Sequence, residues 1–536
     1  MPIVQQGQIN TTALVVPDLY VQIVPPQNLV VNGVPTNVVG VVGTASWGPA
    51  NTPAIIPDMP TYAATFGPVM PRKYDMGTQV ATAVQQGASN FRCVRVTDGT
   101  DTAATALFNG STTGDCSLIV TSLYTGSEAN GDTFTLSAGS AAGSYKATVA
   151  RPGLTPEVFD NIPAATGSPF WSAVAVAVNS GNGPLRGKSN LVSVAAGAGA
   201  NASVNVSSLT LPMTATLGVG AGAVAGTDGV TTLSAATLVG QDTLPRKGMY
   251  CLRGQGCSIG LLADTDDSTQ WTTQAALGLQ EGIYMILTGP AGDTITNATT
   301  TKATAGLDTY GAKLMFGDWL WWNDQTNNIV RLVSPQGFAA GRLANLSPEQ
   351  SSLNKPIYSI VASQKSGSPA SPQTGTYASA DLAALLGAGI DVICNPQPGG
   401  TYWGVRGGHN ASSNAAINGD NYTRLTNYIA ATLAAAMGQF VGMTIDADLF
   451  DDIRSAELGF LQNMLDQGML GSTDGSIPFS VVCDTSNNPP SRTGLGYVQS
   501  NAQVQYMAIN EKFIVNIEGG TTVQVTTQTL PSGQPA

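Results

Sequence analysis

Charged residues are scarce in this 536-residue sequence. Only 10% of the residues are Asp, Glu, Lys or Arg, and 34 acidic residues against 22 basic ones give a net charge of -12. Nucleic-acid binding needs clustered basic side chains that neutralise phosphates, and the sequence has neither a basic balance nor a Lys/Arg run. Soluble monomers usually carry about 25% charged residues. The low fraction therefore predicts that copies of the chain cover much of its surface.

Targeting and membrane segments are also missing. The first residues contain no basic stretch before an apolar run, which predicts that the chain is not exported and stays in the cytosol. Residues 189–227 carry no charge, but their Ser, Asn, Thr, Gly and Ala content favours loops and β structure over a membrane helix. The cysteines are few and scattered, which predicts buried thiols in a reducing compartment and leaves open a disulfide after release from the cell. They are Cys93, Cys116, Cys251, Cys257, Cys394 and Cys483.

The remaining composition predicts a folded chain of several units. Hydrophobic residues make up 43% of the sequence, and the length corresponds to about three or four domains. Apolar residues recur every fourth position over 75–87, which predicts a helix between the β-rich runs 30–42 and 91–96. A second helix with Ser268 as its N-cap and a strand over 283–287 predict that this α/β pattern resumes and shares the same sheet.

The middle of the chain differs in composition. From about residue 98 to residue 227, Thr, Ser, Ala, Gly and Asn dominate. Short alternating runs such as 172–178 predict strands, and the whole stretch is predicted to be an inserted β-rich domain.

The last third is the most regular. Apolar residues spaced by three and four predict helices over 422–437 and 446–468. The second helix has an acidic face that consists of Asp448, Asp451, Asp452, Glu457 and Asp466. Strands are predicted over 504–509 and 513–517.

These patterns predict a mixed α+β and α/β multidomain fold with extended terminal strand arms. The expected parts are an N-terminal arm (1–28), an α/β domain (29–97 and 228–333), the inserted β-rich domain (98–227), a C-terminal α+β domain (334–509) and a C-terminal strand arm (510–536).

One catalytic pattern is present in the sequence. Ser258 lies in a G-x-S-x-G motif, and the only histidine, His409, follows after candidate acids such as Asp318 and Asp391, in the chain order of an α/β-hydrolase. A nucleophile elbow needs a strand before the serine and a helix after it, whereas here a Gly-rich loop precedes Ser258 and a β run follows. The pattern favours a turn that enters a strand. A serine esterase remains a distant alternative.

Other ligand motifs are incomplete. Asp264 and Asp266 copy the opening of a calcium loop, but Thr269 and Ala275 replace its required Gly and Glu. The cysteines lack the spacing of zinc pairs, and the Gly-rich segments lack the Lys-Ser/Thr of a phosphate loop. The cluster of Trp319, Trp321 and Trp322 is more typical of buried anchors than of a ligand site. His409 is predicted in a surface loop, and no cofactor, metal or catalytic residue is expected.

Several short segments, taken in order, resemble the tail sheath proteins of contractile-tailed bacteriophages. The resemblance covers nearly all of the chain except the insert. The first matching segments are 17–23, similar to a Pro-Gly-Val-Tyr-Val arm with Asp18 in place of Gly, then 40–49 with Tyr62, Phe66 and Gly67, the strand 91–96, and the turn 226–229. The later ones are 334–337 with Ala340 and Gly341, 354–356, and 402–406, where Gly407 replaces the usual Thr.

The resemblance implies a structural protein without enzymatic activity. It implies hexameric rings of identical subunits, stacked helically around an inner tail tube, with baseplate and tail terminator or neck proteins at the ends, and no direct contact with nucleic acid or insertion into a membrane. Such a sheath is assembled in the host bacterial cytoplasm and becomes part of the virion. Terminal arms add strands to neighbouring subunits, and the expected donor residues are Leu19, Tyr20, Val21, Ile23, Val24, Phe513, Ile514, Val515 and Ile517.

The implied mechanism is mechanical. An extended, metastable helix of subunits contracts and drives the tube through the host envelope, so that the genome is delivered. Asp448, Asp451 and Asp452 are candidates for facing the tube, although a merely solvated helix face is nearly as well supported. The sheath of a phage-like bacteriocin or contractile injection system is an alternative that uses the same physics.

Overall fold

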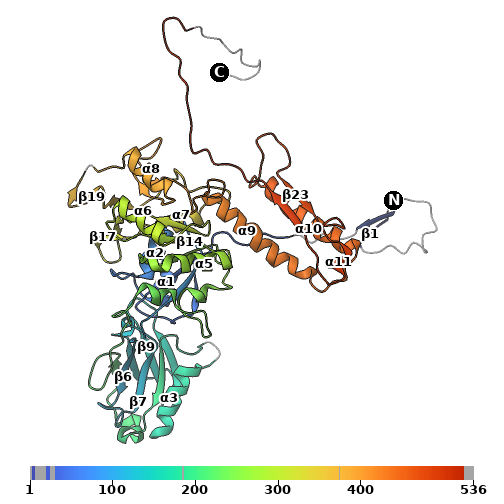
Figure 1. Ribbon diagram of the computed structural model, residues 1–536. Helices are drawn as coiled ribbons and strands as arrows, with labels where there is room; N and C mark the ends of the chain where they lie inside the picture. Colours follow the sequence, from blue (N-terminus) through green and yellow to red (C-terminus); the bar gives the residue numbers. More distant parts are fainter. Residues whose placement is uncertain (1–2, 7–19, 24–30, 184–185, 374, 524–536) are drawn as a thin grey trace.

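The computed structural model describes residues 3–6, 20–23, 31–183, 186–373 and 375–523. A β-rich region lies at one end of the molecule, a layered α/β body lies in the middle, and a helical C-terminal region projects sideways from the body (Figure 1). The predicted mixed α/β multidomain fold is confirmed.

A six-stranded sheet forms the centre of the body, in the order β15-β14-β13-β3-β5-β4. Five strands are parallel and β4 is antiparallel at one edge. The prediction that two distant α/β units share a sheet is confirmed, because Ile259 of β13 pairs with Val39 of β3. The strands are β3 (Val39–Gly43), β4 (Pro53–Ile56), β5 (Phe91–Arg95), β13 (Ile259–Leu262), β14 (Tyr284–Thr288) and β15 (Ala312–Met315).

Helices cover both faces of this sheet, which explains why its parallel strands are almost entirely buried. One face packs against α1 (Met59–Phe66), α2 (Met76–Val84) and α7 (Gln336–Ala344). The other face packs against α4 (Ala235–Val239), α5 (Trp271–Glu281), α6 (Ile295–Thr304) and α8 (Ser379–Gly387).

The predicted N-cap of α5 is wrong. Asp267, not Ser268, accepts a hydrogen bond from the backbone N–H of Thr269 at 3.0 Å. Asp267 caps a 3-10 turn over Ser268–Gln270 that leads into the helix, so Ser268 lies inside that turn, and Gln270, directly before α5, makes no side-chain cap bond.

The inserted region contains two antiparallel sheets and one helix around a core of its own. The first sheet has the order β11-β7-β6 and the second the order β10-β9-β8-β12. Its elements are β6 (Ala103–Phe108), β7 (Leu118–Thr125), β8 (Thr133–Ala138), β9 (Ser144–Ala150), β10 (Glu157–Pro163), α3 (Ser168–Ser180), β11 (Val192–Ala196) and β12 (Met213–Thr216).

The strand predicted over 172–178 is wrong, because these residues lie in α3. The run alternates Val with Ala and therefore fits a period of two. In the structure Val174 and Val178, four residues apart, are buried, whereas Val176 between them is 61% exposed. Packing of one helix face against the two sheets decided the conformation.

The segments that lead into and out of the inserted region lie side by side. Thr102 and Thr227 form an antiparallel bridge with backbone hydrogen bonds of 3.2 and 3.1 Å. At the same junction, the fully buried Arg95 donates to the carbonyl oxygens of Gly48 and Thr125, both at 2.7 Å. These bonds fasten the insert to the edge of the body.

The C-terminal half adds small sheets to the body and then the projecting region. The body carries β16 (Leu320–Asp324), β17 (Ile329–Val333), β18 (Ile360–Ser363), β19 (Gly367–Ser368), β20 (Ser371–Pro372), β21 (Ile393–Cys394) and β22 (Gly404–Val405). The projecting region comprises α9 (Asp420–Met437), α10 (Ala447–Asp466), β23 (Phe479–Val482), α11 (Pro490–Thr493) and β24 (Asn501–Val504). Short 3-10 turns lie at 127–129, 200–203, 206–208, 248–252, 268–270 and 438–440.

Several predictions about single residues are confirmed. All six cysteines are buried and free. Trp319 and Trp322 are buried and donate to Gly289 and Gln85, as anchors do, whereas Trp321 is only half-buried. Among the described helices, none is long and apolar enough to cross a membrane.

Candidate interaction surfaces of the C-terminal region

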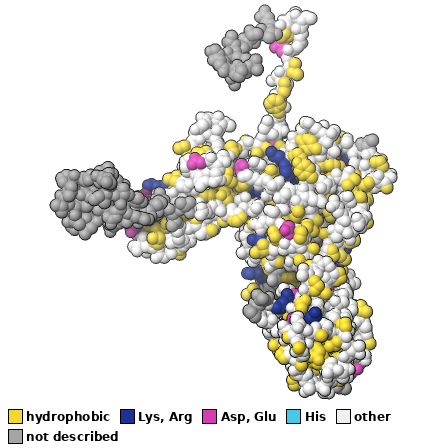
Figure 2. Space-filling model, turned by 180° about the vertical axis from the view of Figure 1, so that it is seen from behind, with side chains coloured by type: hydrophobic (Ala, Val, Ile, Leu, Met, Phe, Trp, Pro, Cys, Tyr) yellow, Lys and Arg dark blue, Asp and Glu magenta, His cyan; other side chains and the backbone are white. Residues whose placement is uncertain are grey.

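The last described stretch, residues 505–523, forms no helix or strand, and its later part extends away from the molecule (Figure 1). We call residues 512–523 the C-terminal arm. The exposed fraction is 83% for Phe513, 80% for Ile514, 61% for Val515 and 87% for Ile517, and Figure 2 shows hydrophobic side chains along this arm. Large apolar side chains in a contiguous exposed row are typical of a contact surface.

Two predicted strands differ from the structure here. A strand is expected over 504–509, but the observed strand β24 covers Asn501–Val504. After Val504 the chain leaves β23 and passes along α9. Residues 513–517 form no strand in the single chain. A strand is defined by a partner ladder, and no described strand pairs with this segment.

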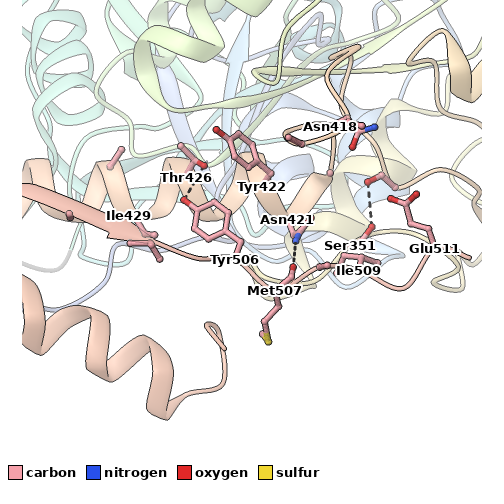
Figure 3. A pocket seen from close by; sticks show the side chains of 18 of the residues that line it. Ser351, Asn418, Asn421, Tyr422, Thr426, Ile429, Tyr506, Met507, Ile509 and Glu511 are labelled. Carbon is pink, nitrogen blue, oxygen red and sulfur yellow. Dashed lines mark hydrogen bonds between the residues drawn. The ribbon is translucent and has the colours of Figure 1, made fainter. Parts of the chain in front are cut away.

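Aromatic and polar contacts hold the start of this stretch against α9 (Figure 3). The ring of Tyr506 meets that of Tyr422 edge to face, with centroids 5.7 Å apart, and its hydroxyl pairs with Thr426 Oγ1 at 3.1 Å. Asn421 Nδ2 donates to the carbonyl oxygen of Met507 at 3.1 Å. These contacts border a groove of about 720 Å³ between α9 and residues 502–511.

The last contact before the arm is made by the only histidine. His409 Nε2 lies 2.8 Å from Glu511 Oε1. His409 lies in the loop before α9, as predicted, and its side chain is 15% exposed. The backbone N–H groups of Gly407, Gly408 and His409 donate to the buried carboxylate of Asp391, which draws the loop inward. The free part of the chain therefore begins at Lys512.

The small sheet of β23 and β24 offers unpaired edges. Phe479 pairs with Val504 and Val482 pairs with Asn501 in antiparallel register. Each of the two strands has a single partner among the described strands. Phe479, Val481 and Val504 pack one face onto the core formed by α9 and α10. Backbone groups at both outer edges are thus free to pair with a strand from another chain.

The N-terminal donor residues are described only in part. Tyr20, Val21 and Ile23 lie in β2 (Tyr20–Ile23), which pairs in parallel with β1 (Ile3–Gln6). Leu19 and Val24 lie outside the described residues.

The outer face of α10 is acidic at its start. Asp446 caps the helix by accepting from the N–H of Leu449 at 2.9 Å. Asp448, Asp451 and Asp452 are exposed. Among the described residues, only Asp451 of these three has an ion-pair partner, Arg454 at 2.6 Å.

Glu457 does not belong to this acidic face. It is 5% exposed and accepts a hydrogen bond from Ser500 Oγ at 2.6 Å. Burial raises the pKa of this carboxyl group, and the hydrogen bond from Ser500 opposes the rise. The sequence placed Glu457 on the acidic face, but Ser500 in the loop before β24 covers it.

A buried ionic cluster joins α9 to the central sheet. Lys313 Nζ in β15 lies 2.6 Å from Asp391 Oδ2 and 3.1 Å from Asp420 Oδ1, at the first residue of α9. Tyr284 donates to Asp420 at 2.6 Å, and the Ser352 hydroxyl donates to the same carboxylate. Each donor and acceptor in this cluster has an opposite partner, as buried charges require.

The cluster controls the protonation of its members. Burial pushes the pKa of Asp420 upward, but Lys313 and the hydrogen bonds from Ser352 and Tyr284 hold it below its ordinary value. Burial pushes the pKa of Lys313 downward, and the two carboxylates raise it above its ordinary value. Sequence reasoning missed this cluster. The available signal was a lysine inside the otherwise apolar strand β15.

The esterase pattern is not assembled. The Ser258 hydroxyl donates to the carbonyl oxygens of Thr36 and Val38, at 2.8 and 3.1 Å, and β13 follows directly. His409 pairs with Glu511 instead. Asp264, from the incomplete calcium motif, is buried and accepts from Gln79. Among the described residues, no group of three His, Cys, Asp or Glu could hold a metal ion.

No protein-family model matches the chain, and a search of curated proteins gives no significant match. Solved structures do match. A sheath tail protein from Desulfitobacterium hafniense has a TM-score of 0.56 and 15% identity, over 86% of this chain and 92% of that one. A sheath tail protein from Listeria innocua has a TM-score of 0.57 and 13% identity, over 85% and 90%. The contracted sheath of an extracellular contractile injection system, PVC, has a TM-score of 0.51 and 11% identity, over 95% and 99%.

The chain has the fold of contractile sheath proteins. The alignment with the PVC sheath spans 95% of the chain, so the sheath fold here includes most of the insert and of the projecting C-terminal region.

Proposed function

We propose that this chain is a subunit of a contractile sheath around the inner tube of a bacteriophage tail. The observation that carries the proposal is the exposed apolar row of the C-terminal arm together with the unpaired edges of β23 and β24. The arm of one subunit has no strand partner, and the sheet of β23 and β24 in another subunit has unpaired edges. The arm can therefore add to that sheet as a further strand when two subunits meet. The sheath fold supports the same conclusion.

The sequence of the arm fits strand addition. In an extended chain, alternate residues point to opposite sides, so Phe513, Val515 and Ile517 share one side. They would continue the packed face of β23 and β24, while Ile514 and Glu518 would lie on the other side. Tyr20, Val21 and Ile23 in the N-terminal arm are the donors proposed for a second neighbour, with Leu19 and Val24 beside them in the sequence. Contacts of this head-to-tail kind continue into a helix when the rotation does not close.

Contraction would follow from repacking of whole subunits. The subunits assemble as an extended, kinetically trapped helix of hexameric rings, and a baseplate signal releases them into a shorter and wider helix with more buried contact. The arms act as tethers that survive the change. The tube is driven through the host envelope without nucleotide hydrolysis, and tail terminator or neck proteins close the other end.

Two surfaces complete the proposal. Asp448, Asp451 and Asp452 form an exposed acidic patch that would face the tube, since a charged contact separates more readily than an apolar one during sliding. The insert lies at the end of the body away from the arm (Figure 1) and would face outward.

A second candidate is the sheath of a phage-like bacteriocin or injection system. The likeness to the PVC sheath favours it, because that structure belongs to an extracellular contractile injection system. Electron microscopy of native particles that contain the chain separates the two candidates. Particles with nucleic-acid-filled heads support the phage tail, and headless particles support the second candidate.

The first test is negative-stain electron microscopy of the purified chain. The full chain is expected to form tubes, and a version that ends at Asn510 is expected to stay monomeric. A matched control that ends at Val523 keeps the apolar row and is expected to form tubes. Monomers from all three versions at high concentration, with and without the inner tube, would contradict the proposal.

A further inference from the structure

A second groove lies at the far end of the projecting region. It has a volume of about 660 Å³ and separates the end of α9 from the start of α10 and the loop before β24. Most of its walls are apolar, with Met437, Phe440, Met443, Leu449, Ile453 and Tyr497 among them. It ends at Ser500, directly before the unpaired edge strand β24.

A buried carboxylate also lines this apolar groove. Glu457 is 5% exposed, and its one hydrogen bond comes from Ser500. No Lys, Arg or His among the described residues forms an ion pair with it, since Arg454, one turn earlier, pairs with Asp451. An unpaired carboxylate in an apolar site is costly for a folded chain. A lysine side chain matches the site, because its aliphatic stem suits the walls and its ammonium group suits Glu457.

Lys512 is a free lysine next to the proposed interface. It is exposed, and no carboxylate among the described residues pairs with it. It directly precedes the apolar row that starts at Phe513. Charge complementarity and this continuity with the arm single it out as the occupant.

The Lys512 of the same chain is too far away. Its neighbour Glu511 is held by His409, and His409 bridges Gly419 at the start of α9. The groove lies at the other end of α9, and 18 helical residues span roughly 27 Å. The lysine must therefore come from another subunit.

We propose that the groove binds Lys512 of a second copy of the chain, with Glu457 as the partner of its ammonium group. The proposal rests on the proposed function and specifies how the arm is seated. With Lys512 in the groove beside Ser500, the following apolar row runs along the sheet from the Ser500 end, parallel to β24. The exposed carboxylates of Asp448 and Asp452 on the same half of α10 add attraction for the lysine.

Charge exchange tests this pairing. The variants E457Q and K512Q are each expected to raise the concentration needed for polymer formation by about 30-fold or more, as expected when one partner of a buried interfacial pair is removed. E457K and K512E should each block assembly, and the double variant, in which the two charges are exchanged, should restore it. The control K247Q removes an exposed lysine of the body and should leave assembly unchanged.

Folding is checked separately. E457Q keeps an acceptor for Ser500 and removes an uncompensated buried charge, so its monomer should unfold at the same temperature as the unaltered chain or a higher one at neutral pH. Weaker assembly from a stable monomer then reports the lost contact. K512Q changes an exposed residue and gives the same answer without a folding effect.

Chemical cross-linking supplies a direct readout. A carbodiimide joins a carboxylate and an ammonium group in contact as an amide, with loss of water to the reagent. Polymers made from equal amounts of nitrogen-15-labelled and unlabelled full chain should yield a peptide pair that joins Glu457 to Lys512, half of it with mixed labels.

The outcomes separate the two proposals. Unchanged assembly of E457Q and K512Q overturns the pairing and leaves the sheath proposal standing. Loss of assembly only on inner tubes, with normal tube-free polymers, also overturns it and assigns the groove to a basic side chain of the tube. Cross-links found only within a single label class, with no mixed pairs, overturn the contact between copies. If the unaltered chain forms no polymer, the proposed function itself fails.

Discussion

Lys313 Nζ lies 2.6 Å from Asp391 Oδ2, and both side chains are at most 1% exposed. The same ammonium group lies 3.1 Å from Asp420 Oδ1 and donates to the carbonyl oxygen of His409 at 3.0 Å, so one lysine of the central sheet contacts both the loop before α9 and the first residue of α9. The direction in which the C-terminal region projects is therefore set inside the body.

Replacement of Lys313 by Met should destabilise the chain strongly. Two buried carboxylates would lose their cation, and a loss of about 3–5 kcal/mol in the free energy of unfolding is expected. Urea denaturation at neutral pH measures it. Lys247→Met, at an exposed position, should stay within about 0.5 kcal/mol of the unaltered chain. A similarly small change for Lys313→Met would show that the cluster contributes little.

Stability should fall as pH rises from about 4 to about 7. Asp75, the buried N-cap of α2, has its pKa raised to about 7 by burial, against hydrogen bonds from Thr78. The ordinary pKa of Asp is about 3.9, so between these values the folded chain holds a proton that the unfolded chain has lost, and the unfolded state is favoured as pH rises.

The variant Asp75→Asn should flatten this part of the pH profile. An amide oxygen still accepts from Thr78, but the group no longer titrates. Asp264, whose pKa burial raises to about 6, contributes a remaining slope of the same sign. Urea denaturation between pH 4 and pH 8 measures the effect, with the exposed Asp452→Asn as control. An unaltered slope in Asp75→Asn would assign the pH dependence to other groups.

Replacement of Phe513, Val515 and Ile517 together by Ser should abolish polymer formation and leave the monomer as stable as before. These side chains contact solvent in the single chain, so only the contact between subunits is lost. Sedimentation velocity measures the assembly and thermal unfolding measures the stability. The matched control Ile514→Ser changes the other side of the extended chain and should assemble more readily than the triple variant. Equal assembly of the triple variant and the unaltered chain would argue against strand addition through this face.

Reversal of Asp448, Asp451 and Asp452 to Lys should impair assembly on inner tubes much more than tube-free polymer formation, if the acidic patch faces the tube. Co-sedimentation with purified tubes measures the first, and electron microscopy measures the second. Unchanged assembly on tubes would mean that the patch is only a solvated helix face. The Lys512 contact predicts an additional, smaller loss in tube-free polymers, because the patch borders its groove.

Deletion of the insert should preserve polymer formation. Thr102 and Thr227 already form an antiparallel bridge, so an Asn-Gly turn in place of residues 103–226 closes the chain with little distortion. Arg95 loses its bond to Thr125 and keeps the one to Gly48, which predicts lower stability with retained assembly. Electron microscopy decides the point, and a soluble variant that stays monomeric would give the insert a role in subunit contacts.

Hydrophobic periodicity determined much of the fold. The spacing of apolar residues identified α2, α9 and α10. Each of these helices buries one face, and one buried face gives the same apolar spacing whatever element packs against it. The β-rich runs on either side of the insert identified strands of one sheet, since parallel strands covered on both faces are apolar throughout.

Tertiary structure decided the remaining features. Val174, Val176 and Val178 fit a strand by period, and only packing against two sheets made them a helix. Glu457 belongs to the acidic face by spacing, yet the loop before β24 buries it. The Lys313 cluster joins residues more than 70 positions apart in the sequence, and no pattern of neighbouring residues predicts such a contact.

The conformation of the C-terminal arm depends on a strand partner that the single chain does not supply. Aromatic and β-branched residues make up most of the arm's sequence, so composition alone identified Phe513 to Ile517 as strand material. A strand exists only where its N–H and C=O groups find a ladder, and within a single subunit residues 513–517 find none among the described strands. The sequence by itself determined the strand-forming character of this segment and the layers of the body. Only the tertiary structure decided that the segment is left exposed, because the contacts of Tyr506, Met507 and Glu511 with α9 and the loop before it direct the chain away from its own sheet.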